Sequence, residues 1–329
     1  MRALQVHELG EPADVLQLVD IPAPTPAQRQ VAIQVEAGGL NFPDVLMCRG
    51  QYQARPSLPF TPGAEVCGRI IAVGADVARS RVGERVVALT ALPAGGFADV
   101  ALAESDQAYA IPEHHDATVW AGLTITYQTG WVALHTRARI QPGEWVLVHA
   151  GAGGVGSAAI QVALAAGARV IATAGGPEKV QQCLALGAHA AFDNRADDWV
   201  AGVKDVTGGH GADIIYDSVG GDVYDLSTKC IAFEGRILII GFTSGRIPQA
   251  AANHVLIKNY SVVGVHWGYY HQMKPEIPKQ AHAALVDLLE SGAIAPAVSR
   301  ILTLDEIPDA LRALSERGAH GKLVWSATA

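Results

Sequence analysis

The residues with the clearest chemical potential form a glycine-rich segment, Gly151-Ala152-Gly153-Gly154-Val155-Gly156. An apolar run over 146–150 precedes it, and a run of small and apolar residues over 157–167 follows, so the pattern predicts a strand, a tight turn and a helix. In such a unit Gly151 permits the turn, Gly153 or Gly154 lets the backbone approach a diphosphate, and Gly156 lets the helix pack closely on the sheet. The helix N-terminus favours the negative charge of the diphosphate. Because strand, helix and a second strand all flank the glycines, we predict a dinucleotide site rather than a structural turn.

The end of the second strand indicates which dinucleotide is bound. An NAD site usually has Asp or Glu there to bind the ribose 2′-hydroxyl. Here the strand ends in Thr173-Ala174-Gly175-Gly176 without an acid, Lys179 follows in the next helical turn, and Arg195 comes after the third strand. Missing negative charge with positive charge nearby favours a 2′-phosphate, and therefore NADPH over NADH. The alternative is that Lys179 is an ordinary solvated residue of a helix surface.

The remaining pattern indicates an α/β protein. Residues 1 to about 115 are rich in short β-branched runs, of which 31–37 alternates most clearly. After Asp116 predicted helices alternate with near-continuous apolar strands at 146–150, 169–174, 213–217, 236–240 and 261–265, which is typical of a doubly wound parallel sheet. From about residue 263 this rhythm stops. Two amphipathic helices and a strand at 322–325 are too little for an independent domain, so we expect them to pack on the N-terminal region.

Composition excludes several classes of function. The chain has 329 residues, enough for two domains, and a net charge of −8 without a long basic stretch, which argues against nucleic acid as a partner. No apolar run approaches the roughly 20 residues of a membrane span. The first residues alternate like a strand and do not resemble a signal peptide. None of the four cysteines lies in a C-x-x-C pair, so we expect a reducing compartment and a cytoplasmic location.

Motifs over nearly the whole length resemble those of the zinc-independent quinone oxidoreductases of the medium-chain dehydrogenase/reductase superfamily. Besides the glycine-rich segment, they are Gly39-Leu40-Asn41-Phe42-Pro43-Asp44, Arg49-Gly50-Gln51-Tyr52, Pro62-Gly63-Ala64-Glu65-Val66-Cys67-Gly68, Gly95-Gly96-Phe97-Ala98, Gly122-Leu123-Thr124, Glu178-Lys179, Leu186-Gly187-Ala188, Tyr216-Asp217-Ser218-Val219-Gly220 and Val265-His266-Trp267-Gly268. The resemblance implies a GroES-like β-barrel substrate domain over 1–121, a Rossmann NADP-binding domain over 122–262, and a return to the substrate domain over 263–329. It also implies a homodimer joined through edge strands of the cofactor sheets.

The resemblance further implies the residues of the site. The positions matching Asn41, Tyr52 and Thr124 line the nicotinamide end of the cleft and are the catalytic candidates. The cofactor candidates are Asn41, Thr124, Gly151, Ala152, Gly153, Gly154, Val155, Gly156, Thr173, Lys179, Asn194, Ser218, Gly241, Phe242 and Val265. Two of these depart from the family pattern: Asn194 replaces a frequent tyrosine beside the 2′-phosphate, and the loop from Thr173 lacks a frequent serine but offers the Thr173 hydroxyl.

Zinc is the sharpest distinction within the superfamily. Zinc alcohol dehydrogenases carry a cysteine where this chain has Asn41, Gly-His-Glu where it has Gly63-Ala64-Glu65, and a four-cysteine lobe near residues 90–110, where it has no cysteine. A catalytic zinc needs about three protein ligands. His114 and His115 are adjacent and on a strand would point in opposite directions, while Cys48 and Cys67 are expected to be small buried hydrophobic residues. We therefore predict a metal-free protein.

Without a Lewis acid, the acceptors that fit best are quinones and alkenes conjugated to a carbonyl, small molecules that accept hydride from NADPH readily. The acceptor oxygen then gains negative charge and needs a hydrogen-bond donor or a proton. Asn41 could donate an amide hydrogen bond or simply form a turn, and Tyr52 could donate its hydroxyl or be a half-buried aromatic residue. Asp44 is expected to cap a helix, and His266 is a weaker proton donor at a strand end. The alternatives to a quinone or enone reductase are an enoyl-thioester reductase and a crystallin-like cofactor-binding protein without significant turnover.

Overall fold

The computed structural model describes residues 1–196, 198–316 and 318–329, which form two compact units. Unit 1 comprises Met1–Ile125 and Pro296–Ala329, and unit 2 comprises Thr126–Ala295. The chain therefore re-enters unit 1 at Pro296, whereas the sequence pattern placed the return at residue 263. The reason is that the strand Ser261–Gly264 pairs in the sheet of unit 2, and the helix Glu276–Glu290 packs against the helical segment Val132–Ala138 of the same unit.

Unit 1 is built on a seven-stranded, mainly antiparallel sheet with the order β14-β15-β3-β4-β5-β7, in which β6 also pairs with β3. A separate hairpin of β1 and β2 completes its strands. Its elements are β1 (Arg2–Val6), α1 (Pro12–Val15), β2 (Leu16–Asp20), β3 (Gln30–Gly39), α2 (Phe42–Cys48), β4 (Glu65–Val73), η1 (Arg79–Arg81), β5 (Arg85–Leu89), β6 (Val100–Glu104), η2 (Ser105–Gln107), β7 (Ala108–Ala110), α3 (Ala117–Ala121), β14 (Val298–Leu302), η5 (Leu304–Glu306), α12 (Ile307–Ser315) and β15 (Lys322–Ser326).

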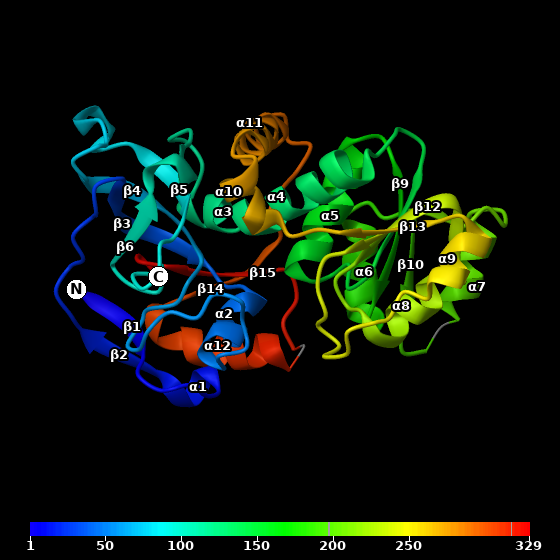
Figure 1. The fold of residues 1–329 in the computed structure, drawn as a ribbon, viewed down its shortest axis with the longest axis horizontal. Helices are drawn as coiled ribbons and strands as arrows, with labels where there is room; N and C mark the ends of the chain where they lie inside the picture. Colours follow the sequence, from blue (N-terminus) through cyan, green and yellow to red (C-terminus); the bar gives the residue numbers. More distant parts are fainter. Residues whose placement is uncertain (197, 317) are drawn as a thin grey trace. The chain divides into compact units, whose positions relative to one another are not determined.

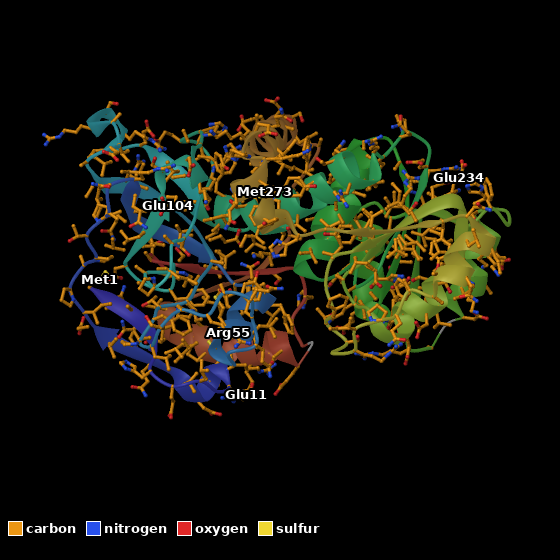
Figure 2. All side chains as sticks on the ribbon, viewed as in Figure 1. Met1, Glu11, Arg55, Glu104, Glu234 and Met273 are labelled. Carbon is orange, nitrogen blue, oxygen red and sulfur yellow. The ribbon has the colours of Figure 1, made fainter. Side chains whose placement is uncertain are left out.

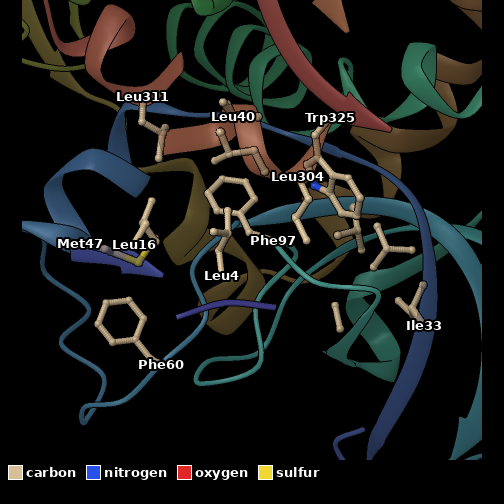
Figure 3. Close-up of a cluster of buried hydrophobic side chains, with 14 of the residues drawn as sticks. Leu4, Leu16, Ile33, Leu40, Met47, Phe60, Phe97, Leu304, Leu311 and Trp325 are labelled. Carbon is tan, nitrogen blue, oxygen red and sulfur yellow. The ribbon is translucent and has the colours of Figure 1, made fainter. Parts of the chain in front are cut away.

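The core of unit 1 joins segments from both ends of the chain. Figure 3 shows side chains of the N-terminal strands, such as Leu4 and Ile33, gathered with Phe97, Leu311 and Trp325. All five of these side chains are at most 2% exposed. Since a fully buried large apolar side chain contributes about 1.5–3 kcal/mol, this packing ties β15 firmly to β3. The C-terminal strand is thus fixed beside the residues that precede α2.

Unit 2 is a six-stranded, all-parallel sheet with the order β10-β9-β8-β11-β12-β13. Figure 1 shows these strands with their connecting helices in green to yellow. The elements, beginning with a helix that crosses the unit boundary, are α4 (Thr124–Trp131), the π-helix η3 (Val132–Ala138), β8 (Trp145–Val148), α5 (Gly154–Ala165), β9 (Arg169–Ala174), α6 (Pro177–Ala185), β10 (Ala190–Asp193), α7 (Trp199–Val206), β11 (Ala212–Asp217), α8 (Gly221–Ser227), β12 (Ile231–Ile239), α9 (Ala252–Lys258), β13 (Ser261–Gly264), η4 (Trp267–Tyr269), α10 (Tyr270–Met273) and α11 (Glu276–Glu290).

Local sequence explains why these elements begin and end where they do. Pro177 occupies the first turn of α6, where its missing N–H costs nothing, and Gly187 just beyond the helix has a φ of 97°, which glycine adopts without strain. The strands β8, β9 and β11 are almost entirely buried because helices cover both faces of the sheet. β12 is longer than the apolar run at 236–240, because it begins at Ile231 and ends at Ile239. Within the described residues, no helix combines the length and apolarity needed to cross a membrane.

Candidate functional site

The glycine-rich turn of unit 2 lies between β8 and α5, as its spacing predicts. Its left-handed residue is Ala150, with a φ of 50°, so the tight turn does not depend on a positive φ at Gly151. Gly151 is needed for space, because a Cβ there would come within 3.2 Å of Cys183, Ala172 and Ile160. A Cβ on Gly156 would overlap the carbonyl oxygen of Ala150. The turn is therefore packed too tightly for side chains and presents backbone amides at the start of α5, where phosphate oxygens bind well.

The predicted cofactor residues of unit 2 share one edge of the sheet. Thr173, Asn194, Ser218, Gly241 and Val265 lie at or just after the carboxyl ends of β9, β10, β11, β12 and β13. Backbone hydrogen bonds link these ends, among them Gly151 N to Thr173 O at 2.9 Å and Val265 N to Ile239 O at 3.0 Å. Ligands of open parallel sheets bind outside the carboxyl ends of the strands. The structure thus brings together residues that are up to 92 positions apart in the sequence, from Thr173 to Val265.

Phe242 belongs to this edge as well. Its neighbour Thr243 donates a backbone hydrogen bond to Ser218 O at 3.2 Å, which joins the loops after β11 and β12. The Asp217 carboxylate shapes the first loop by accepting the backbone N–H groups of Val219 and Gly220, each at 2.8 Å. Phe242 itself is 38% exposed, so its ring is available to a ligand.

The Thr173 hydroxyl takes part in a buried hydrogen-bond chain with His149 and Ser227. It lies 2.8 Å from Nδ1 of the fully buried His149, whose Nε2 lies 2.8 Å from Ser227 Oγ. Since Ser227 donates its only hydroxyl hydrogen to Val223 O, His149 carries its proton on Nε2 and Thr173 donates to Nδ1. The Thr173 hydroxyl can accept but not donate a further hydrogen bond. Burial lowers the pKa of His149 to about 4, so this connection is neutral.

The end of β9 is surrounded by positive side chains. The Arg195 guanidinium lies over Gly175, where a Cβ would come within 2.9 Å of Nε. Burial, followed by the charge of Arg195, lowers the pKa of Lys179. This electrostatic effect shows that the two cations are close to each other. Asp193 is a nearby acid that the sequence prediction overlooked. Its Oδ1 accepts the backbone N–H groups of Gly176 and Arg195, each at 3.0 Å, and so holds the loop.

Unit 1 contains a buried polar cluster made of Asn41, Glu65 and Lys322. The Lys322 ammonium donates to Asn41 Oδ1 at 2.7 Å and to Glu65 Oε1 at 2.5 Å, and Asn41 Nδ2 donates to the same Glu65 oxygen at 2.9 Å. The side chains of Lys322 and Glu65 are 5% and 0% exposed. One N–H of Asn41 is therefore already engaged inside the protein, and the other is 3.4 Å from Gly39 O.

Asp44 caps α2, as predicted, by accepting the Asn41 backbone N–H at 2.7 Å. Burial, with a contribution from the charge of Glu65, raises the pKa of Asp44 to about 7 against the opposing effects of the Asn41 N–H and Lys322. Its Oδ1 has no hydrogen-bond partner in the described part of the chain. Tyr52 packs half-buried against the core of unit 1, and burial followed by the charge of Asp44 raises its pKa, so its hydroxyl stays protonated at neutral pH.

Thr124 belongs to the same neighbourhood of unit 1. The next backbone N–H, that of Ile125, donates to Glu65 Oε2 at 2.7 Å, so both carboxylate oxygens of Glu65 are used. The Thr124 side chain is 1% exposed, and its hydroxyl lacks a partner among the described residues. A buried hydroxyl without a partner costs free energy, so a ligand that bonds to it would recover that loss.

The arrangement of possible zinc ligands differs in part from the sequence argument. His114 and His115 lie in a turn, not on a strand, and their ring centroids are only 4.3 Å apart, so the expectation that they point in opposite directions is wrong. The prediction for Cys48 and Cys67 is confirmed: both are fully buried free thiols whose pKa is raised to about 12 by burial.

Sequence reasoning missed Lys322, the role of Glu65, and His149. The sequence context of each is unusual, because a polar residue lies in or beside an apolar strand. Lys and Glu in particular are almost never fully buried unless they are paired. Lys322 begins an apolar strand, Glu65 begins another, and His149 follows the apolar run of β8. The pairing of residues 65 and 322 could not be predicted, because it depends on the order of strands in the sheet.

These features define a two-domain oxidoreductase with a dinucleotide-binding sheet, and comparisons with known proteins agree. Residues 27–113 match the family model described as "Alcohol dehydrogenase GroES-like domain", and residues 154–282 match that described as "Zinc-binding dehydrogenase". The predicted fold class, a Rossmann domain plus a GroES-like domain, is confirmed.

Relatives that match over nearly the whole chain indicate the family more specifically. The chain is 36% identical to quinone oxidoreductase-like protein 2 homolog of Nematostella vectensis, over 98% of this chain and 88% of the relative. It is 34% identical to human quinone oxidoreductase, over 98% and 97%. Among solved structures, Escherichia coli quinone oxidoreductase complexed with NADPH is 30% identical with a TM-score of 0.92, covering 99% of this chain and 100% of that one. The CurK enoyl reductase is 30% identical with a TM-score of 0.87, covering 99% and 98%. The chain belongs to the quinone oxidoreductase family of the medium-chain dehydrogenase/reductase superfamily.

Proposed function

We propose that this protein transfers hydride from NADPH to a quinone or to an α,β-unsaturated carbonyl compound. The observation that carries the cofactor choice is the pair of cations, Lys179 and Arg195, beside the end of β9, a strand whose last residues include no acid. The carboxylate of Asp193, at the end of the neighbouring strand, is occupied by two backbone N–H groups. The NADPH complex of the E. coli relative supports the same choice.

We further propose that the reaction needs no zinc. The residues at the positions of the zinc enzymes' ligands do not fit the metal, because Asn41 offers an amide in place of a thiolate and Ala64 offers no ligand atom. Asn41 Oδ1 and Glu65 Oε1 already accept from the Lys322 ammonium, a cation that repels a second one. Metal analysis of the purified protein tests this, and stoichiometric zinc that leaves together with activity on chelation would refute it.

The chemistry then depends on positioning and hydrogen bonding. Bound NADPH supplies a hydride from its nicotinamide ring, and negative charge develops on the acceptor oxygen. Unit 1 offers two hydroxyl donors for that oxygen: Tyr52, kept protonated, and Thr124, whose hydroxyl lacks a protein partner among the described residues. Both candidate donors to the acceptor are therefore neutral groups.

An acceptor panel tests the proposed function. NADPH absorbance is followed with simple quinones, enones and enoyl thioesters, and each assay is repeated with NADH. We expect turnover of quinones or enones with a clear NADPH preference. The similarity to an enoyl reductase supports one alternative, an enoyl-thioester reductase, which preferential turnover of thioesters would establish. NADPH binding without oxidation by any acceptor would instead identify a cofactor-binding protein without turnover.

We also propose a homodimer formed through unit 2. β13 is the edge strand of the six-stranded sheet, and its outer side has no strand partner in the described chain. Large apolar side chains near this edge are exposed, including Leu256 and Ile257 of α9, each 75% exposed, and Phe233 of β12, 69% exposed. Phe233 precedes Glu234, which is labelled in Figure 2 and has an exposed side chain. Exposed apolar groups beside an open strand edge are typical of a contact between copies.

A further inference from the structure

The Lys322–Glu65–Asn41 cluster of unit 1 forms a closed ring of hydrogen bonds. Lys322 Nζ contacts both other side chains, and these contact each other, with all three distances between 2.5 and 2.9 Å. Gly39 makes room for the ring, because a Cβ there would overlap the Glu65 carboxylate. Glu65 is further anchored by the Ile125 backbone N–H at 2.7 Å. The cluster is therefore constructed by four separate segments of the chain.

This ring determines the orientation of the Asn41 carboxamide. Its oxygen must face the ammonium and its nitrogen must face the carboxylate, since the flipped group would place NH₂ against NH₃⁺ and C=O against a carboxylate. Because the carboxamide is planar, holding the oxygen and one N–H also fixes the direction of the second N–H. That second N–H has only a long contact, 3.4 Å to Gly39 O. The second N–H of Asn41 is therefore the side-chain amide donor that a ligand can engage.

We propose that Lys322 and Glu65 are positioning residues that hold the Asn41 carboxamide so that its second N–H can bond to the bound acceptor or cofactor. This inference rests on the proposed function and on the expectation, implied by the family resemblance, that Asn41 lines the nicotinamide end of the cleft. Lys322 provides a fixed internal cation beside Asn41, where zinc members of the superfamily have a metal thiolate. A buried ion pair contributes little to stability after its desolvation cost, so a positioning role also explains why the pair is present.

The test is a double-mutant cycle on turnover. The neutral pair Lys322→Met/Glu65→Gln removes the ring without leaving a buried charge unpaired, so the fold is expected to survive. Its kcat with 1,4-naphthoquinone should fall by about 10- to 100-fold, as expected for a misaligned donor, while the NADPH dissociation constant changes less than about threefold. In an Asn41→Ala background the same pair of changes should have no further effect on kcat. The proposal would be overturned if the folded pair variant kept the wild-type kcat. It would also be overturned if the pair of changes lowered kcat in the Asn41→Ala background as much as it does in the wild type.

A matched control uses another ion pair of unit 1. Arg85 Nε lies 2.9 Å from Glu36 Oε2, with the arginine 8% exposed, and the pair is remote along β5 from Leu89, which faces Glu65. Arg85→Met/Glu36→Gln should alter the melting temperature but leave kcat within about twofold of wild type. An equal loss of kcat in the control would show that the effect comes from general loosening of unit 1.

A second measurement does not depend on turnover or on folding of the pair variant. With selectively ¹⁵N-labelled asparagine, the Asn41 side-chain amide is identified as the signal absent from Asn41→Ala. In the wild type we expect at least one of its protons to exchange slowly with water. Rapid exchange of both protons would refute the proposal that Lys322 and Glu65 hold the Asn41 carboxamide in place. If none of the tested acceptors supports NADPH oxidation by the wild type, the proposed function fails. The exchange rate of the Asn41 amide then decides alone whether Lys322 and Glu65 hold this side chain in place.

Discussion

In the proposed function, cofactor choice depends on two cationic side chains, Lys179 and Arg195. Their positions beside Gly175 suit a 2′-phosphate, and a charge-assisted hydrogen bond contributes about 1.5–3 kcal/mol. We predict that Lys179→Ala and Arg195→Ala each raise the KM for NADPH about 10-fold or more in steady-state assays. NADH lacks the phosphate, so its KM should stay within about twofold. Lys204→Ala on α7 serves as a charge-matched control with no expected effect, and equal changes for both cofactors would contradict the assignment.

Asp44 shows how one residue can combine a structural and an electrostatic effect. Its folded-state pKa of about 7 lies above its ordinary value of 3.8, so between these pH values the folded protein binds more protons than the unfolded chain. Its contribution therefore stabilises the fold as the pH falls from about 7 towards 4. We predict that Asp44→Asn removes this contribution. The difference in unfolding free energy between wild type and variant should move in favour of wild type as the pH falls. A difference that does not vary with pH in denaturant titrations would count against a buried, titrating Asp44.

Among the elements, the strand–turn–helix unit of β8 and α5 has no room for a side chain at Gly156. Gly156→Ala places a methyl group against the Ala150 carbonyl, so the helix must shift away from the turn. We predict destabilisation by about 1–3 kcal/mol, the usual range for overpacking, and at least a tenfold weaker NADPH affinity by fluorescence titration. Gly268→Ala is the control, since the nearest atom to its Cβ is 3.8 Å away. Wild-type affinity in Gly156→Ala would show that the diphosphate does not depend on this turn.

His149 connects three elements, and its titration has the opposite sign to that of Asp44. Its folded-state pKa of about 4 lies below the ordinary 6.5, so in this window the unfolded chain binds more protons and the fold loses stability as the pH falls. The full effect is about 3 kcal/mol as an upper bound, at roughly 1.4 kcal/mol per pH unit. Above pH 6.5 the group contributes no pH dependence. We predict that wild type loses stability relative to His149→Gln between about pH 6.5 and pH 4.5 in urea titrations. If the unfolding free energies of the wild type and His149→Gln change equally with pH, His149 is not the titrating group.

The elements also show where sequence reasoning succeeds and where it stops. Strand, turn and helix around Gly151–Gly156 follow local rules of periodicity and glycine placement, and the structure agrees with them. The hydrogen bond between Thr173 and His149 could not be predicted, because the two residues are 24 positions apart and meet only through the pairing of β8 with β9. The cluster at Asn41 needed a lysine 281 residues later. Non-local pairings of this kind depend on strand order, which the local pattern does not contain.

At the scale of the whole molecule, the proposed dimer forms through the open edge of the unit 2 sheet. The apolar side chains of Leu256 and Ile257 on α9 are the most exposed of the large hydrophobic residues, and covering both removes apolar surface worth about 25 cal/mol per Å². We predict a dimer by light scattering coupled to size-exclusion chromatography. Leu256→Lys/Ile257→Lys should shift the protein to monomer, because four like charges would meet across a two-fold contact. Ile71→Lys, on an exposed position of unit 1, is the matched control and should remain dimeric. If the α9 variant is still a dimer, the contact uses another surface. If its kcat is unchanged as a monomer, each copy carries a complete site.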